Sequence, residues 1–187
     1  VINSFGSKAI AGYSAGMRIE SLSIVPMLAM GNAMSTFTAQ NMGAGKIDRV
    51  KEGYRMCYVI VLTAGAVLCV MYQLAGGAFV SLFLDSGSSE AYSVGLSYVK
   101  FLSFFYSFIG LKASTDGLLR GAGDVTAFTV ANLVNLAIRV SVTNLFAPVY
   151  GIQVAWMAVP LGWAANYVIS FGWYLTGKWK KVRVIKK

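Results

Sequence analysis

Histidine is absent from the 187 residues of this chain. This absence excludes a histidine metal site, a histidine proton relay and catalytic sets such as Ser-His-Asp or Cys-His. Cysteine is almost absent too, because Cys57 and Cys69 are the only two. Twelve residues apart on one predicted helix, they stand roughly 18 Å from each other, too far for a disulfide. We interpret both as small apolar side chains.

Charged residues are scarce as well, and hydrophobic residues are correspondingly abundant. Asp, Glu, Lys and Arg make up 12% of the chain and hydrophobic residues 57%, whereas a soluble domain is about 25% charged. The mean hydropathy is +0.64. A water-soluble fold of this length could not bury so much apolar surface, so the composition predicts that lipid is the solvent.

The net charge of +9 does not point to nucleic acid. Eleven of the sixteen basic residues lie in the C-terminal tail and in two short predicted loops, if Arg55 at the edge of the first loop is included. Cytoplasmic loops of membrane proteins and surfaces facing anionic lipid favour this placement. We therefore expect a lipid bilayer, and no nucleic acid, among the partners.

Five apolar runs are long enough to cross a bilayer, which takes about 20 mostly apolar residues. They cover residues 9–39, 54–74, 91–118, 125–146 and 152–176. The sequence shows no separate soluble domain between them. We expect one all-α, polytopic membrane domain over residues 1–187, with about five transmembrane helices and a basic tail at 177–187.

The basic residues also predict an orientation. Lys46, Arg49 and Lys51 follow the first run, Arg120 follows the third, and the tail follows the fifth. With five spans these basic segments share one side, which places the C-terminus in the cytoplasm of a plasma (inner) membrane protein. The chain begins at Val1 without a signal peptide, so we expect a piece of a longer protein.

Motifs for catalysis are missing from the sequence. The segment GAGK at 43–46 lacks the Walker A spacing, because Gln40 and Ile47 stand where a glycine and a Ser or Thr are required. We interpret it, and GAGD at 121–124, as helix-ending glycine turns. The prediction is a protein that is not an enzyme and holds no cofactor.

Ionisable residues inside the predicted spans are the main functional candidates, because a charge in lipid is costly. Arg18 and Glu20 point to different faces of the first span. Lys112 and Asp116, four residues apart in the third, can pair along the helix, and we favour a structural pair. Arg139 in the fourth span needs a partner or water. Two roles for Glu20 are equally open: it could hold two helices together, or it could bind a cation or a proton.

Two polar stripes at helical spacing accompany these charges. The fourth span carries Thr129, Asn132, Asn135, Arg139 and Thr143, and the third carries Ser103, Ser107, Gly110 and Ser114. Such stripes either pack helices closely or line a water-filled cavity. Close packing is slightly favoured, although the embedded Arg139 supports a cavity.

Three segments together resemble a known family. The segments INSFGSKAIAGYSAGMRIESLSIVP at 2–26, FTAQNMGAGKIDR at 37–49 and LLRGAGD at 118–124 resemble the C-terminal half of multidrug and toxic compound extrusion (MATE) transporters. The resemblance implies that the five spans are the last five helices of a twelve-helix, two-lobe transporter. It also implies that residues 1–8 end the seventh helix and that the missing N-terminal lobe is a partner.

The resemblance implies a function, too: part of a cation-coupled antiporter that exports cationic, amphiphilic compounds in exchange for Na⁺ or H⁺. Glu20, Tyr106 and Phe105 are candidate contacts for such small molecules. The chain departs from the family in one respect, because residues 106–110 hold no acid where several members carry a carboxylate. Coupling would then depend on Glu20 or on the absent lobe.

Two alternatives remain open. A flippase of related fold for lipid-linked oligosaccharide or polysaccharide precursors would need several arginines facing its cavity for the phosphates, and only Arg18 and Arg139 qualify. A membrane scaffold without transport activity is the other alternative, and the embedded charges argue against it.

Overall fold

The computed structural model describes residues 6–85 and 89–181 of the chain. These residues form helices only. They are α1 (Ser7–Gly43), α2 (Ile47–Ser81), α3 (Ser89–Ser103), α4 (Tyr106–Gly121), α5 (Val125–Tyr150), α6 (Gln153–Leu175) and the short 3₁₀ helix η2 (Lys178–Lys181). The all-α prediction is confirmed for this part of the chain.

Four of the helices, α1, α2, α5 and α6, are long and apolar enough to cross a membrane. The pair α3 and α4 passes the same test when taken together, which gives up to five candidate spans among the described residues. Large side chains such as Leu74 and Val149 are more than 70% exposed on the outside of the bundle. Because lipid tails solvate such surfaces and water does not, the fold is that of a multi-pass membrane protein.

The predicted third span is broken, which the sequence did not indicate. Helix α3 ends at Ser103, α4 begins at Tyr106, and their axes differ by 52°. The side chain of Gln73 in α2 donates from its amide nitrogen to the Lys100 carbonyl and to the Ser103 hydroxyl, both at 2.9 Å. These bonds tie α2 to the last turn of α3, immediately before the break.

The helices extend beyond the predicted spans. The predicted loop at 40–53 shrinks to the turn between Gly43 and Ile47, since α1 and α2 continue into it. Hydropathy marks only the apolar part of a helix, and a helix that projects beyond the membrane keeps its hydrogen bonds in polar surroundings. The same projection includes Ser7 and Lys8 in α1. The expectation that they end a preceding helix was therefore wrong. Residues 1–5 lie outside the described residues.

Both glycine turns end helices as predicted. Gly45 after α1 and Gly123 after α4 have φ angles of 70° and 84°, which favour glycine. The amides that follow, those of Lys46 and Asp124, bond back to carbonyls of the preceding helix at 2.8 and 2.9 Å. Asp124 then caps α5 by accepting from the Ala127 amide, so each turn reverses the chain within a few residues.

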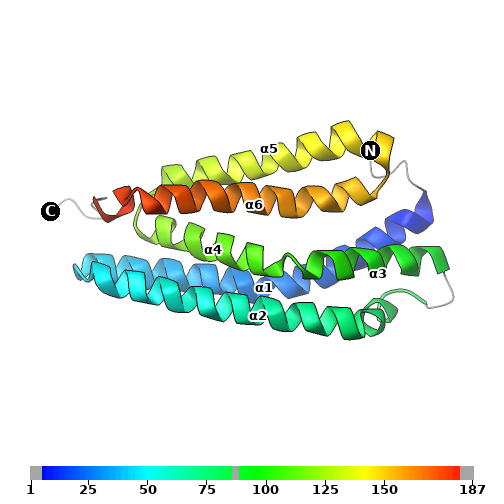
Figure 1. The fold of residues 1–187 in the computed structure, drawn as a ribbon, viewed down its shortest axis with the longest axis horizontal. Coiled ribbons are helices and arrows are strands. Elements are labelled where there is room, and N and C mark those ends of the chain that lie inside the picture. Colours follow the sequence, from blue (N-terminus) through cyan, green and yellow to red (C-terminus); the bar gives the residue numbers. More distant parts are fainter. Residues whose placement is uncertain (1–5, 86–88, 182–187) are drawn as a thin grey trace.

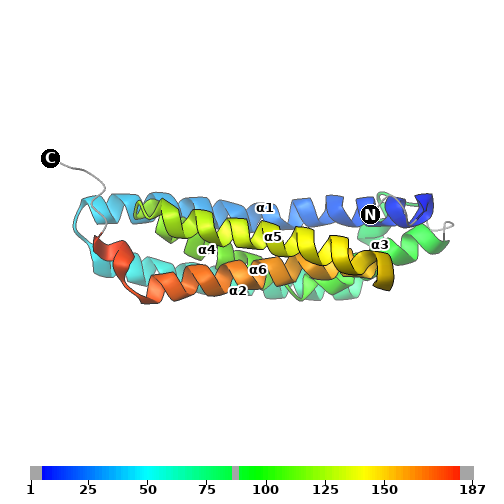
Figure 2. The same cartoon turned by 90° about the horizontal axis from the view of Figure 1, so that it is seen from above.

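The bundle is elongated, with its helices running roughly along the long axis (Figure 1). The α1–α2 turn and η2 lie at one end, and the start of α3 and the α5–α6 turn lie at the other (Figures 1 and 2). Small residues bring α1 and α4 into backbone contact. A Cβ on Gly117 would stand 2.1 Å from the Gly31 carbonyl oxygen, and one on Gly121 2.2 Å from that of Ser35.

Candidate functional site

The structure places the embedded ionisable residues in two separate regions. The first, here called the Glu20 site, consists of Glu20, Tyr13, Tyr98 and Trp156. The hydroxyl of Tyr98 in α3 donates to the carboxylate of Glu20 in α1. The Tyr98 ring meets the rings of Tyr13 and Trp156 edge-on, with centroids 5.3 and 5.6 Å apart. A carboxylate among aromatic rings is an arrangement that attracts cations.

The two embedded arginines lie at the surface of the bundle. Arg18 is exposed on α1 beside Phe83 and Leu84, and no ion pair in the described residues joins it to Glu20. Arg139 is exposed on α5, and its positive charge acts on Glu20 through space. The prediction that Arg18 and Glu20 do not pair is confirmed.

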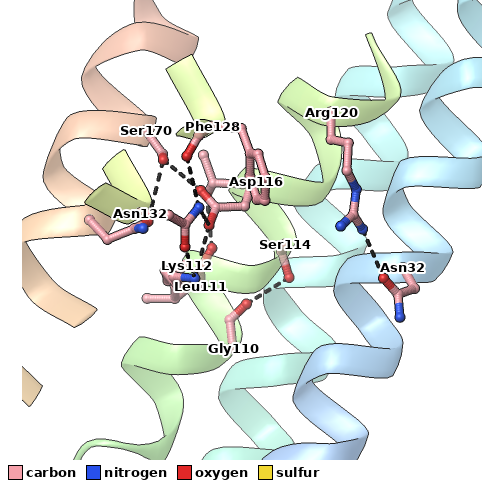
Figure 3. Close-up of polar contacts among 12 residues, drawn as sticks. Asn32, Gly110, Leu111, Lys112, Ser114, Asp116, Arg120, Phe128, Asn132 and Ser170 are labelled. Atoms are coloured by element: carbon pink, nitrogen blue, oxygen red, sulfur yellow. Dashed lines mark hydrogen bonds and ion pairs between the residues drawn. The ribbon is translucent and has the colours of Figure 1, made fainter. Parts of the chain in front are cut away.

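The second region is a polar cluster of Lys112, Asp116, Asn132 and Ser170 (Figure 3). The ammonium of Lys112 lies 3.1 Å from a carboxylate oxygen of Asp116, so the predicted pair forms. Asp116 also accepts from Ser170 of α6 at 2.6 Å and from the Asn132 amide of α5 at 3.4 Å. Lys112 donates to the Asn132 side-chain oxygen at 3.0 Å.

The polar cluster ties α4 to α5 and α6. The Asp116 side chain is 5% exposed and that of Lys112 is 14% exposed. Three donors occupy three of the roughly four lone-pair positions of the carboxylate, which leaves little room for a coupling ion. This geometry agrees with the preference for a structural pair at these two positions.

A cleft of about 240 Å³, here called the polar cleft, opens beside the cluster between α1, α4 and α5. Its charged walls are Lys112, Asp116 and Arg120. Arg120 donates to the Asn32 side-chain oxygen at 2.8 Å and to the Ser35 hydroxyl at 3.4 Å, and its guanidinium lies over the Phe128 ring. Arg120 stood out in the sequence only as a marker of orientation.

The third-span stripe packs against other helices, whereas the fourth-span stripe does so only in part, since Thr129 and Arg139 are exposed. Ser103 and Ser114 are buried, and a Cβ on Gly65 of α2 would stand 2.3 Å from the Ser107 hydroxyl. A Cβ on Gly162 of α6 would likewise stand 2.3 Å from the Asn135 side-chain oxygen. Within the fourth-span stripe, Asn132 belongs to the polar cleft, so the cavity alternative holds for that residue.

Tyr106 lies in the helical core with no exposed surface, beside the ring of Tyr72 at 5.9 Å. It could reach a cargo molecule only after a rearrangement, so its predicted contact role gains no support here. Sequence reasoning missed Tyr13, Tyr98, Trp156 and Ser170. Nothing in their neighbourhoods distinguishes them, because each acquires its role from a partner on another helix.

Taken together, the fold and its buried polar contacts define a polytopic helical membrane protein with charges held between its helices. Comparison with known proteins then gives the family. The family model described as MatE matches residues 1–146. The chain therefore belongs to the MatE family, as the resemblance implied.

Similar proteins agree with this assignment. The probable multidrug resistance protein YpnP of Bacillus subtilis is 29% identical over 98% of this chain and 41% of its own length. The probable multidrug resistance protein NorM of Thermotoga maritima is 22% identical over 97% of this chain and 39% of its own length. The chain thus spans about two fifths of the relatives that it matches, and neither relative is named as an enzyme.

A solved structure described as MATE in the bent conformation has the same fold. It matches with a TM-score of 0.84 at 17% identity, over 95% of this chain and 40% of that one. The five-span arrangement is therefore that of part of a MATE transporter.

Proposed function

We propose that this chain is part of a plasma-membrane antiporter that exports cationic, amphiphilic compounds in exchange for Na⁺ or H⁺. The observation that supports it best is the Glu20 site. There, a carboxylate inside a predicted span lies against a buried tyrosine and within a group of aromatic rings. The names of the two relatives as probable multidrug resistance proteins support it as well.

The chemistry of the Glu20 site suits such an exchange. A carboxylate in low-dielectric surroundings attracts a cation more strongly than one in water. Tyr13, Tyr98 and Trp156 are buried, as Tyr106 is, so their faces would add cation–π attraction for large, weakly hydrated cations only after a rearrangement opens the site. Because a single carboxylate neutralises one positive charge, a coupling ion and a cationic cargo would compete for it, and this competition couples their movements.

Alternating access would come from movement of this lobe against a second lobe in the full-length transporter. The C-terminus would lie in the cytoplasm, since Lys46, Arg49, Arg120 and Lys178 all fall at or near one end of the bundle. The flippase alternative is less well supported, because Arg18 and Arg139, its two candidate phosphate ligands, are both exposed at the surface of the bundle.

The test is dye efflux from drug-sensitive bacteria that express the full-length protein. We expect Glu20→Gln to reduce ethidium efflux to the level of cells without the transporter, because the amide keeps the shape and removes the charge. The matched control is Glu52→Gln, which changes an exposed carboxylate at the start of α2. Normal efflux by a well-expressed Glu20→Gln protein would disprove the role of Glu20.

A further inference from the structure

We propose that the polar cleft binds a phosphate group, and that this site is separate from the Glu20 site. Its charged residues lie on α4, where Lys112 and Arg120 are eight residues apart, about 12 Å along the helix. The α1 wall begins at Leu28, eight residues beyond Glu20. The cleft therefore adds a second binding site, whose test does not depend on the proposed efflux activity.

The charge of the cleft favours an anion. Lys112 and Arg120 contribute two positive charges to its walls, and Asp116 contributes one negative charge. That negative charge is already bound to the Lys112 ammonium and to two neutral donors. A cation entering the cleft would meet the remaining positive charge, whereas an anion would be attracted by it.

Donor groups remain available for the anion. An ammonium has three N–H groups, and the contacts described for Lys112 use two of them. A guanidinium has five, and those described for Arg120 also use two. The Asn32 oxygen faces Arg120, so its amide group is left as a further donor. The Arg120 fork and the neighbouring Asn32 amide suit a tetrahedral oxyanion, and the Lys112 charge elsewhere in the cleft adds to the attraction.

The size and position of the cleft indicate which phosphate compounds fit. At about 240 Å³ the cleft is smaller than most drug-binding pockets. It would hold a head group rather than a whole amphiphile. Leu28, Ala113 and Phe128 form an apolar part of its wall, along which an acyl chain could lie. Arg120 stands next to the last residue of α4, near the depth of lipid head groups in a five-span arrangement.

Two sources could supply this group: the phosphodiester of an anionic lipid, or a soluble phosphate ester. The experiment uses full-length protein, delipidated in a detergent that contains no phosphate. One arm titrates phosphatidylglycerol and counts retained lipid by native mass spectrometry. The other arm titrates glycerol 3-phosphate and follows thermal stability. Binding in the first arm alone identifies the lipid, and binding in the second identifies the soluble ester; either supports the site.

Variants of Arg120 locate the binding. We expect Arg120→Gln to weaken binding by about tenfold or more, the usual effect of losing a charge-assisted hydrogen bond. Arg120→Lys, which keeps the charge and loses the fork, should weaken it less. The control is Arg49→Gln, which removes an exposed charge from α2 near the same end of the bundle. Equal binding by wild type and Arg120→Gln, an equal loss in Arg49→Gln, or no binding of either compound would overturn the proposal.

Discussion

The embedded charges of this protein differ in how fully their neighbours compensate them. The carboxylate of Asp116 accepts from three groups on three helices. Glu20 accepts from the Tyr98 hydroxyl alone among the described side-chain contacts. A buried charge with a complete set of partners holds a structure together, whereas one with few partners retains the capacity to bind a ligand. This difference separates the two carboxylates more clearly than their positions in the sequence.

The polar cluster provides the first prediction. Asp116→Ala leaves the Lys112 ammonium in a mostly buried position without its counter-charge, so we expect a loss of about 3–5 kcal/mol in the free energy of unfolding. Reversible unfolding in mixed micelles measures it. The control is Asp48→Ala. Asp48 and Lys51 form a solvent-exposed ion pair, so its loss should change the free energy of unfolding little. Similar losses in both variants would contradict the structural role of the cluster.

The Glu20 site provides the second prediction. Tyr98→Phe removes the hydroxyl that donates to Glu20 and keeps the ring that packs against Trp156. We expect the affinity for tetraphenylphosphonium to change by roughly tenfold or more, since a hydrogen bond to a charged group contributes about 1.5–3 kcal/mol. Calorimetric titration of the purified full-length protein measures this. The control is Tyr92→Phe, which lies on the same helix but outside the site and should leave the affinity unchanged. An unchanged affinity in Tyr98→Phe would exclude Tyr98 from the site.

At the scale of elements, close backbone contact and one broken helix determine how the helices meet. Helices in lipid gain little from the hydrophobic effect between them, so their association depends on tight packing and interhelical hydrogen bonds. Glycines supply the tight packing between α1 and α4. Gln73 supplies the hydrogen bonds at the break between α3 and α4.

The contact between α1 and α4 leads to the third prediction. Gly117→Ala would place a methyl group 2.1 Å from the Gly31 carbonyl oxygen, so one helix must move. We expect a loss of about 1–3 kcal/mol, which is typical of overpacking. Gly172→Ala in α6 is the matched control, because nothing lies within 4 Å of its added methyl group. That change should stabilise the helix by about 0.5–1 kcal/mol. Thermal unfolding compares the two, and equal midpoints would contradict close contact at Gly117.

The break between α3 and α4 leads to the fourth prediction. Gln73→Leu removes both donors to the break and keeps a side chain of similar size. We expect faster hydrogen exchange at the amides of residues 104–108, since local opening no longer breaks these two bonds. The control is Gln40→Leu at an exposed position near the end of α1. If exchange at the break is the same in wild type and Gln73→Leu, the glutamine does not hold it.

At the scale of the whole molecule, the two ends of the bundle differ in their connections. One end carries the α1–α2 turn, the α4–α5 turn and η2, and the other carries the start of α3 and the α5–α6 turn (Figure 1). Trp179 of η2 is completely buried and donates to the Tyr174 carbonyl at 3.1 Å. The described part of the basic tail is thus packed against the bundle, whereas residues 182–187 lie outside the described residues.

The fifth prediction concerns sidedness. In a full-length protein with Cys57 and Cys69 replaced by alanine, single cysteines are introduced as Lys46→Cys, Lys180→Cys and Glu90→Cys. A maleimide that does not cross membranes should label Glu90→Cys in intact cells and the other two only after permeabilisation. The reason is that an odd number of spans separates Glu90 from each of the other positions. Labelling of all three in intact cells would contradict the five-span arrangement.

Much of the fold was predictable because the signals for it are local. Apolar runs located all five spans, and the glycines at 45 and 123 located two turns, since each depends on residues next to one another. The Lys112–Asp116 pair was also predictable, because residues four apart meet on any helix. The break after Ser103 was not, because neither proline nor glycine marks it and the stabilising Gln73 lies thirty residues earlier.

The sequence by itself determined the solvent, the helical class, the candidate spans and the family. These follow from composition, from the length of apolar runs and from contiguous motifs. Only the tertiary structure decided which partners the embedded charges have on other helices. Asp116 meets Ser170 across 54 residues, and Glu20 meets Tyr98 across 78. The physical reason is that the cost of a charge in lipid depends on the donors around it in space, and helix packing brings those donors together from distant parts of the chain.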